Sequence, residues 1–504
     1  MGECYAFPHF SWKNIMEDFQ IPSPYLEAVK QINGNVLLFH RIFGGYICLS
    51  SQQYLDFTEK KYHKIDFQTQ QKLDALHFFI SCNEHEKEKY TSLLASRTSN
   101  AQSGDNLRCL ELSVSESCNF RCTYCTFWRN KAEKGVSVMH PNIAVSIVQD
   151  FIATLPKERR NGKRPLIYFG TGEPLLNWKA IKKVVEYVRG IPGGSEINLS
   201  LITNGSLVTK EKLEFLKLHN VSVGISLDGP PDIQRIQRPA ASPNVDSGTV
   251  VLDALCLARE IGFQFSSLSA TYDTPGFEQH ARYVLDLCSE YSIPEFDLDY
   301  DIGSLHENSD VEQISEEILA CYYAARARNI GVFGYWIVPY ENIIQNKKNI
   351  PEFCQNYSGE SVCITPKGEF KLCGYEPASI GAFSNIRAAL KSKVYPEKIL
   401  LNEQSVLKSC KNCEIEGVCA GQCPISPRNT VSWSSGCELY RMITKKLLQN
   451  HLDSIPWKGD FFKHSIFTIK KTPTFLWKVL LIFDLVASRR IELRLREWES
   501  RVLT

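Results

Sequence analysis

The chain has 504 residues, of which 43% are hydrophobic and 22% charged, an ordinary composition for a folded globular protein. This length exceeds what a single hydrophobic core organises, so we expect about three domains. The formal net charge of +1 gives no electrostatic support for binding a nucleic acid or another strongly charged surface. We therefore expect no nucleic-acid partner.

The cysteine content is high, with 18 cysteines in the chain. The N-terminal segment has neither the basic stretch nor the apolar stretch of a secretory signal, so we expect a cytoplasmic protein in a reducing compartment. Clustered cysteines in such a compartment indicate metal or redox sites before they indicate disulfides. No apolar run reaches the roughly 20 residues that a membrane-spanning helix needs, and no membrane partner is expected.

Residues 1–105 are predicted to form a separate α+β domain. Residues 35–50 indicate a hairpin, because two β-rich runs flank Gly44 and Gly45. A helix is predicted to follow from Ser51. Residues 97–106 are rich in serine, asparagine and glycine, and they predict a linker to the next domain.

Residues 106–345 alternate short β-rich runs with helical patterns. The runs are residues 110–114, 165–170, 197–203, 221–227, 263–270 and 295–302. Between them, Ile143, Ile147, Phe151 and Leu155 share one face of a predicted helix, and Gly262 follows another helix as its cap. This alternation predicts an α/β fold, a parallel sheet curled into a partial (β/α)6 barrel with ligands at the carboxyl ends of its strands.

Residues 346–440 carry eight of the 18 cysteines and show little periodic structure. Such a segment predicts a small C-terminal domain that is held together by metal rather than by a large hydrophobic core. Residues 441–504 are predicted to form a helical tail. Elsewhere, Cys256, Cys288 and Cys321 fall in amphipathic helical patterns and are interpreted as small core residues.

The first group of cysteines, Cys118, Cys122 and Cys125, follows the first β-rich run directly. Three thiolates on one loop can bind three irons of a [4Fe–4S] cluster and leave the fourth iron open to a small molecule. S-adenosylmethionine suits that iron, because its amine and carboxylate can chelate a metal. A zinc site is the alternative, although no fourth histidine or cysteine follows within the loop.

Later strand ends carry further motifs. They are Gly170-Thr171-Gly172-Glu173-Pro174, Thr203-Asn204-Gly205, Ser226-Leu227-Asp228-Gly229 and the isolated Arg238. Together with the CxxxCxYC spacing of the first cysteines, this series resembles the radical S-adenosylmethionine (radical SAM) superfamily. Only Thr171 departs from the family's GGEP motif.

The resemblance implies which residues bind S-adenosylmethionine (SAM) beside the first cluster. The backbone at Gly172 and the carboxylate of Glu173 would receive the amino group of SAM, and Arg238 would pair with its carboxylate. The full implied set is Tyr124, Gly172, Glu173, Thr203, Asn204, Ser226, Asp228 and Arg238.

The second group of cysteines resembles the seven-cysteine SPASM domain, a resemblance that implies two auxiliary [4Fe–4S] clusters and so three in all. It implies one cluster on Cys410, Cys413, Cys419 and Cys437, and another on Cys354, Cys373 and Cys423. The latter lacks a fourth ligand, which is either Cys363 or no protein group at all. A pair of structural zinc sites is the alternative for this segment.

The same resemblance implies an enzyme that modifies a ribosomally made peptide. A 5′-deoxyadenosyl radical would abstract hydrogen from the precursor peptide, and a thioether or carbon–carbon cross-link would then form. The implied partners are the precursor peptide and a small reducing protein of the flavodoxin or ferredoxin type. Residues 1–105 would either bind the leader of the peptide through a strand edge or cap the barrel.

Two alternatives stay open. Sulfatase-maturing relatives oxidise cysteine or serine to formylglycine, and they carry an acidic residue directly after the cysteine of the GxxxxC motif, where this chain has Gly374. Its absence favours peptide cross-linking, and the general base is not assigned, with Tyr375 and Glu376 as weak candidates. A non-enzymatic iron–sulfur electron carrier would need the clusters but not the residues around an open iron.

Overall fold

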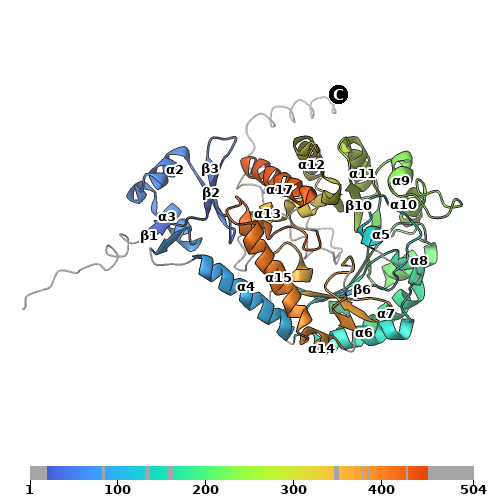
Figure 1. The fold of residues 1–504 in the computed structure, drawn as a ribbon. Helices are drawn as coiled ribbons and strands as arrows, with labels where there is room; N and C mark the ends of the chain where they lie inside the picture. The colour runs from blue at the N-terminus through green and yellow to red at the C-terminus, as the bar shows by residue number, and fades with distance from the viewer. Residues whose placement is uncertain are drawn as a thin grey trace, which may run out of the picture. The chain divides into compact units, whose positions relative to one another are not determined.

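The computed structural model describes residues 20–81, 86–130, 137–156, 163–345, 351–376, 379–382, 385–426 and 430–451 (Figure 1). The chain divides into two units, residues 1–465 and 466–504, and all the described residues belong to the first. Most of the predicted C-terminal tail, from residue 452 onward, lies outside the described residues.

A ten-stranded sheet forms the centre of this unit, in the order β12-β11-β10-β9-β8-β7-β6-β13-β14-β15. Its six predicted strands are β6 Cys109–Leu112, β7 Leu166–Phe169, β8 Asn198–Thr203, β9 Ser222–Ser226, β10 Ser267–Tyr272 and β11 Glu295–Tyr300. All six are parallel and neighbour one another in chain order, as predicted. The α/β class is thereby confirmed.

The sheet is larger than the six predicted strands. β12 Gly331–Phe333 adds a parallel strand beside β11, and β13 Ser361–Ile364 pairs in parallel with β6 at the opposite side. The antiparallel strands β14 Glu369–Lys371 and β15 Gly381–Ala382 continue from β13. The second cysteine region is therefore joined to the barrel by main-chain hydrogen bonds.

The sheet curls around a lumen. The loop after β6 contacts the ends of distant strands: the Thr123 hydroxyl lies 3.4 Å from the Asp273 carboxylate after β10, and the Tyr124 hydroxyl donates to Asp228 after β9 at 2.6 Å. Neighbouring strands lie about 4.8 Å apart, so a flat sheet would separate β6 and β10 by about 19 Å. These contacts agree with a barrel-like curvature.

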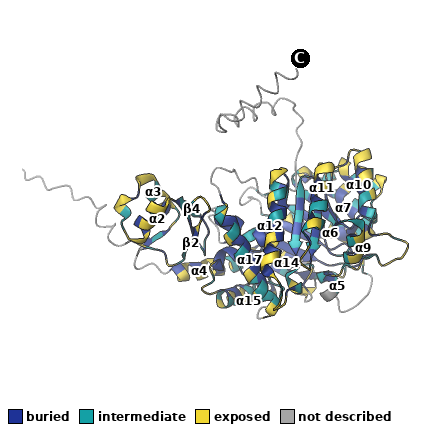
Figure 2. Cartoon of the chain, turned by 90° about the horizontal axis from the view of Figure 1, so that it is seen from above, coloured by how far each residue is buried: buried dark blue, intermediate teal, exposed yellow. Residues whose placement is uncertain are grey.

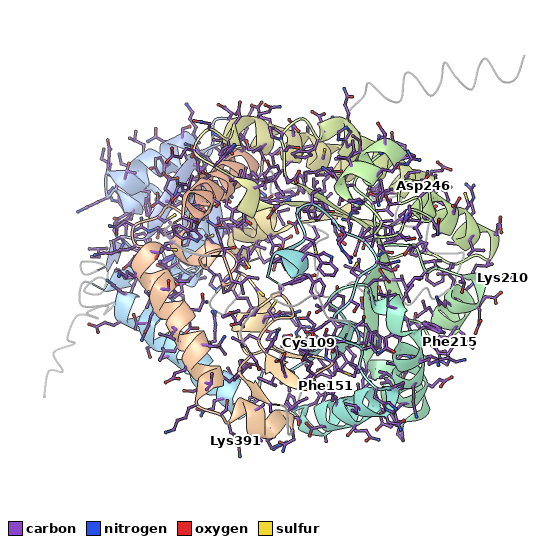
Figure 3. The ribbon with its side chains drawn as sticks, turned by 45° about the vertical axis from the view of Figure 1, so that its right-hand side comes forward. Cys109, Phe151, Lys210, Phe215, Asp246 and Lys391 are labelled. Carbon is purple, nitrogen blue, oxygen red and sulfur yellow. The ribbon has the colours of Figure 1, made fainter. Side chains whose placement is uncertain are left out.

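Helices cover the outer face of the sheet, and the most deeply buried residues lie between the two layers (Figure 2). These helices are α6 Pro141–Thr154, α7 Trp178–Gly190, α8 Lys210–Leu218, α9 Pro231–Gln237, α10 Val250–Glu260, α11 Glu278–Glu290 and α12 Val311–Ala327. In Figure 3, Phe151 lies inside this arrangement and Lys210 on its surface. On α6 the predicted face is partly wrong, because Ile143 is exposed and Ala144 takes its place in the core.

Two of the three cysteines that were predicted to be core residues are buried. Cys288 and Cys321 are buried as predicted, whereas Cys256 is exposed. Its sulfur lies 3.5 Å from the Tyr291 hydroxyl, so the prediction for Cys256 is wrong. Among the described helices, none is long and apolar enough to cross a membrane.

The N-terminal region contains the predicted hairpin, β3 and β4, and three further strands. β2 Leu26–Lys30, β3 Val36–His40 and β4 Tyr46–Leu49 form an antiparallel sheet, and β1 Gln20–Pro22 pairs with β5 Phe79–Ser81. The helices are α2 Ser51–Thr58, α3 Phe67–Ala75 and α4 Glu86–Ser103. The predicted linker is wrong, because α4 continues through it: Ala101 is buried and Thr98 bonds Glu403 on the next region.

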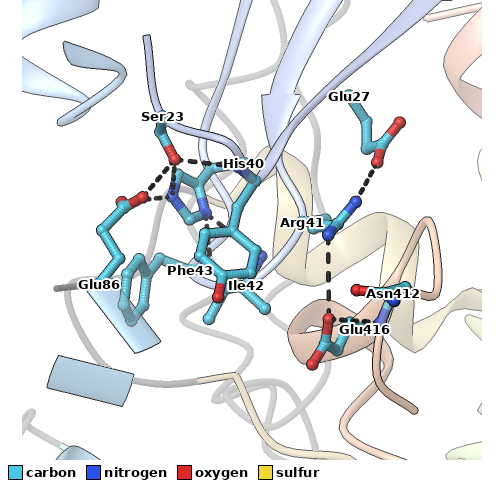
Figure 4. Close-up of polar contacts among 10 residues, drawn as sticks. Ser23, Glu27, His40, Arg41, Ile42, Phe43, Glu86, Asn412 and Glu416 are labelled. Atoms are coloured by element: carbon cyan, nitrogen blue, oxygen red, sulfur yellow. Dashed lines mark hydrogen bonds and ion pairs between the residues drawn. The ribbon is translucent and has the colours of Figure 1, made fainter. Parts of the chain in front are cut away.

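His40 fixes the turn between β3 and β4 (Figure 4). Its Nδ1 accepts hydrogen bonds from the backbone N–H groups of Ile42 and Phe43, each at 3.2 Å. Its Nε2 lies 3.0 Å from the Glu86 carboxylate, which also accepts a bond from Ser23 at 2.5 Å. These contacts are buried, so the turn is held in one conformation.

This turn docks on the second cysteine region. The Arg41 carbonyl accepts backbone hydrogen bonds from Gly417 and Val418, at 2.9 and 3.0 Å. Its guanidinium lies 3.9 Å from Glu416 (Figure 4). Gly417 and Val418 belong to α16 Glu416–Cys419, which carries one of the predicted cluster ligands. The N-terminal domain and the cysteine region therefore share main-chain hydrogen bonds.

The second cysteine region contains more helix than its sequence indicates. Its helices are α13 Val338–Ile344 at its entry, α14 Ile386–Leu390, α15 Val394–Ser409, α16, and α17 Val431–Gln449. Cys437 lies inside α17, so the predicted boundary at residue 440 falls within a helix.

Short 3-10 turns occur along the whole described chain. They are η2 Tyr62–Lys64, η4 Pro174–Asn177, η5 Gly194–Glu196, η6 Ile302–Ser304, η7 Tyr335–Ile337 and η8 Gln355–Tyr357.

The close approach of the N-terminal turn to α16 is testable at Gly417. A Cβ there would lie 2.3 Å from the Ile42 carbonyl oxygen, so Gly417→Ala must separate the two segments. We expect this variant to lose about 1–3 kcal/mol of stability, measured by thermal unfolding. Gly190→Ala is the matched control, because no described atom lies within 4 Å of its added Cβ; equal losses in both variants would contradict the docking.

Candidate active site

The first three cysteines lie on the loop that follows β6. The Cys118 sulfur accepts a hydrogen bond from the Phe120 N–H at 3.4 Å, and the Cys125 N–H donates to the Cys122 carbonyl at 3.2 Å. Burial raises the pKa of Cys118 to about 12 and that of Cys122 to about 11. Binding iron must therefore release protons from these thiols.

Asp228 is the centre of a buried network beside this loop. Its side chain is 0% exposed. Arg238 binds both of its oxygens, with Nε 2.7 Å from Oδ2 and Nη2 2.9 Å from Oδ1. The Tyr124 hydroxyl donates to Oδ2 at 2.6 Å, and the Thr271 N–H donates to Oδ1 at 3.0 Å. The network ties the cysteine loop to the ends of β9 and β10.

Glu173 forms a second network two strands away in the same sheet. Its Oε1 accepts hydrogen bonds from the Leu175 N–H at 3.0 Å and from the Thr203 hydroxyl at 2.8 Å. Its Oε2 accepts one from the Asn204 N–H at 2.8 Å. Burial raises the pKa of Glu173, and these hydrogen bonds oppose that rise. The carboxylate is thereby fixed at the ends of β7 and β8.

Asn204 links this second network to the first cysteine. Its side-chain nitrogen lies 2.9 Å from the Asn119 side-chain oxygen and 3.9 Å from the Cys118 sulfur. Gly172 lies where no side chain fits, because a Cβ would be 2.3 Å from the Ser117 carbonyl oxygen. The GTGEP loop therefore packs directly against the segment that leads into the cysteines.

The predicted SAM-binding residues converge at one end of the sheet. Ser226 precedes Asp228 on the same turn, which Gln234 braces by accepting from the Asp228 N–H at 2.9 Å and donating to the Ser226 carbonyl at 3.3 Å. Within the protein, Arg238 bonds Asp228 through its Nε and Nη2, and its expected pairing with SAM stays a prediction. No sequence motif pointed to Gln234.

The chemistry of these groups fits an iron–sulfur cluster with SAM. The site offers thiols, an N–H donor to a sulfur, and fixed carboxylates at the carboxyl ends of the strands. Among the described residues, no three histidine, cysteine or acidic side chains lie close enough together to hold one metal ion.

The cysteines of the second region fall into two groups. Burial raises the pKa of Cys419, and Cys410, Cys437 and Cys413 add to the rise. Burial likewise raises the pKa of Cys373, with Glu111, Cys354 and Cys423 as the nearby charges. The assignment of these cysteines to the ligand sets of two clusters stays a prediction.

Polar groups around these sulfurs suit thiolate ligands. The Asn356 N–H lies 3.4 Å from the Cys354 sulfur, the same geometry that Phe120 has beside Cys118. The buried Gln422 side chain donates to the Cys437 sulfur at 2.7 Å. Hydrogen bonds to cysteine sulfurs adjust the reduction potential of iron–sulfur clusters.

The sequence motifs gave no role to a row of acidic side chains on β11. Alternation along β11 directs Glu295, Asp297 and Asp299 away from the buried Phe296 and Leu298. Burial raises the pKa of these carboxyls, to about 8, about 6 and about 7 respectively. The period-2 pattern in EFDLDY was the available signal for an inward-facing acidic row.

The chain carries the domain that this site suggests. Residues 112–288 match the radical SAM superfamily, so the chain contains a radical SAM domain. The family implies a [4Fe–4S] cluster and SAM as cofactors. This assignment favours an enzyme over the electron-carrier hypothesis.

Similarity to particular proteins extends beyond that domain. The radical SAM cyclopropyl synthase TigE of Paramaledivibacter caminithermalis is 24% identical over 461 residues, which cover 85% of this chain and 95% of the relative. A cysteine-type anaerobic sulfatase-maturating enzyme of Clostridium perfringens is 30% identical over 130 residues, 25% of this chain and 34% of the relative. The solved structure of native anSMEcpe with bound AdoMet and Cp18Cys peptide aligns with a TM-score of 0.53 at 18% identity, covering 68% of this chain and 97% of that chain. This last similarity supports the fold alone.

The Asp228–Arg238 pair can be tested by removing the cation. Arg238→Ala leaves a fully buried carboxylate without its charge partner, and we expect a loss of about 3–5 kcal/mol in unfolding free energy. Arg235→Ala is the matched control, since Arg235 pairs with Asp246 at the surface, where both side chains are more than 40% exposed. We expect that control to show no measurable change in urea unfolding, and similar losses in both variants would contradict the assignment.

Proposed function

We propose that the chain modifies a ribosomally made precursor peptide by radical SAM chemistry, ending in a thioether or carbon–carbon bond. The observation that carries this proposal is the joining of two cysteine regions by one sheet, through the pairing of β6 with β13. The similarity to a radical SAM cyclopropyl synthase over 95% of that relative's length supports it. We place the enzyme in the cytoplasm, with a flavodoxin or ferredoxin as reductant.

When bound at the first cysteines, the cluster and SAM supply a 5′-deoxyadenosyl radical that takes hydrogen from the substrate. Tyr124 and Arg238 hold Asp228 where it faces the cofactor site, and Arg238 Nη1 is the atom we assign to the carboxylate of SAM. Glu173, fixed by Thr203, is the acceptor we assign to the amino group of SAM.

We propose two auxiliary clusters in the second region. One is bound by Cys410, Cys413, Cys419 and Cys437, and the other by Cys354, Cys373 and Cys423, with Cys363 as the fourth ligand. Cys363 is fully buried on β13, and burial raises its pKa, with Cys373 among the nearby charges. Oxidising a substrate radical releases one electron, and an auxiliary cluster gives that electron a nearby acceptor.

We propose that residues 1–105 bind the leader of the precursor peptide. β2 and β4 are the two outer strands of the three-stranded sheet. A peptide strand could add to such an edge by main-chain hydrogen bonds. The docking of the adjacent β3–β4 turn on α16 would then connect leader binding to the auxiliary region.

The second candidate function is sulfatase-type oxidation to formylglycine. It is favoured by the similarity to cysteine-type sulfatase-maturating enzymes, which spans only about a third of their length. Gly374 counts against it, because this position carries no acid and a Cβ would lie 2.2 Å from the Glu111 carboxylate. We therefore rank peptide cross-linking first.

Cysteine variants test whether the first cluster cleaves SAM and the auxiliary clusters are needed to form the product. Replacing Cys118, Cys122 or Cys125 with alanine is expected to abolish formation of 5′-deoxyadenosine from SAM and dithionite, because the open iron is lost. Replacing Cys413 or Cys419 is expected to leave some uncoupled cleavage while the modified peptide disappears. Mass spectrometry of a co-expressed candidate peptide measures the product, and wild-type product from the latter variants would make the auxiliary region structural only.

The iron content tests the number of clusters independently of activity. After anoxic reconstitution we expect about twelve irons per chain, from three four-iron clusters. Cys363→Ala is expected to lower the count if this thiol is the fourth ligand, and to leave it unchanged if that iron is open. A wild-type count near four would remove both auxiliary clusters.

A further inference from the structure

Glu111, a β6 residue that the proposed function leaves unassigned, joins the two halves of the site. Its side chain is 6% exposed. Its Oε1 accepts a hydrogen bond from the Thr171 hydroxyl at 3.2 Å, and its Oε2 accepts one from the Gly374 N–H at 3.1 Å. One carboxylate therefore bridges the loop that leads into Gly172 and the turn that follows Cys373.

The backbone around Glu111 has room for its carboxylate and for little else. A Cβ at Gly374 would lie 2.2 Å from Glu111 Oε1 and 2.3 Å from Thr171 Oγ1, and a Cβ at Gly170 would lie 2.9 Å from Oε1. Thr171 has a φ of 64°, which a β-branched residue rarely adopts. Thr171 and Gly374, the two departures from the family patterns, thus belong to one arrangement around one carboxylate.

The turn that Glu111 fixes carries Tyr375 into the space between the two cysteine sets. Tyr375 is 41% exposed. Its N–H lies 3.4 Å from the Cys373 sulfur of the second set. The preceding Gly374 packs against Thr171, and the next residue of that loop, Gly172, packs against Ser117, directly before the first set. The turn that carries Tyr375 therefore lies between the two sets.

Glu376, the acidic residue next to Tyr375, contacts a different part of the protein. Glu376 is buried and forms an ion pair with Lys398 on α15. It is therefore held by the helix layer of the second region rather than presented with Tyr375. Of the two candidates that follow Gly374, Tyr375 is therefore the one considered for contact with a substrate.

We propose that Glu111 is a positioning residue: by binding Gly374 and Thr171 it holds Tyr375 between the two cysteine sets, where the ring contacts the substrate. This inference rests on the proposed function, since it needs a substrate in the lumen. A flat, partly exposed ring gives apolar contact area, so it can orient the side chain from which hydrogen is taken. Glu111 itself touches neither substrate nor cofactor.

Hydrogen exchange of the reconstituted holoenzyme with SAM tests the positioning. In Glu111→Ala the Gly374 N–H loses its acceptor, and we expect the amides of residues 373–376 to exchange about tenfold faster. Gly374→Ala is expected to do the same, because its Cβ displaces the carboxylate. Glu111→Gln keeps an acceptor and a partner for Thr171, so it is expected to retain slow exchange.

Glu317→Ala is the matched control. Glu317 is also a buried carboxylate that accepts backbone N–H groups, from Gly276, Phe277 and Glu278 at 2.7–3.2 Å. Its loss is expected to speed exchange at residues 276–278 and not at 373–376. Wild-type protection of residues 373–376 in Glu111→Ala, or equally fast exchange in Glu111→Gln, would overturn the positioning role.

The contact with substrate is tested with the peptide that the wild-type protein modifies. Tyr375→Ala is expected to raise KM about tenfold or to lower the ratio of product to 5′-deoxyadenosine by a similar factor, while Tyr375→Phe stays near wild type. Tyr323→Ala is the control, because Tyr323 is 42% exposed on α12. Unchanged KM and ratio in Tyr375→Ala would overturn the contact. If wild-type protein modifies no peptide, the proposed function fails, and hydrogen exchange still decides the positioning role.

Discussion

The buried pairing of Asp228 with Arg238 is the contact on which the rest of the site depends. Two charges removed from water are stable only when their remaining bonding capacity is met, and here Tyr124 and the Thr271 backbone complete the shell of Asp228. Tyr124 belongs to the cysteine loop, so the pair decides where the three thiols stand relative to the strand ends. Glu173 does the same for the neighbouring strands, which makes the site rigid before any cofactor binds.

Much of the site was predictable, for a geometric reason. Parallel strands end at one edge of a sheet, so motifs that follow successive strands must converge there. Glu173, Asn204 and Asp228 follow β7, β8 and β9, and the structure brings them together as that rule requires. The inward row on β11 was also visible in the alternation of EFDLDY, although only the curvature of the sheet shows what it faces.

What could not be predicted involves contacts between distant segments. Glu111 and Gly374 are 263 positions apart, and they meet only because β13 pairs with β6. The polar residues of α4 read locally as a linker, yet the burial of Ala101 against the cysteine region keeps the helix intact. Local sequence patterns contain no information on such tertiary partners. Tertiary packing therefore overrode the local preference of this segment for a linker.

The contact between the N-terminal turn and α16 limits how the domains of such enzymes could be exchanged. The Arg41 carbonyl holds the first turn of the helix that ends in Cys419, and Gly417 tolerates no side chain there. A chimera that exchanged residues 1–105 alone would pair a foreign loop with a native helix. Both segments would therefore have to be exchanged together as one block.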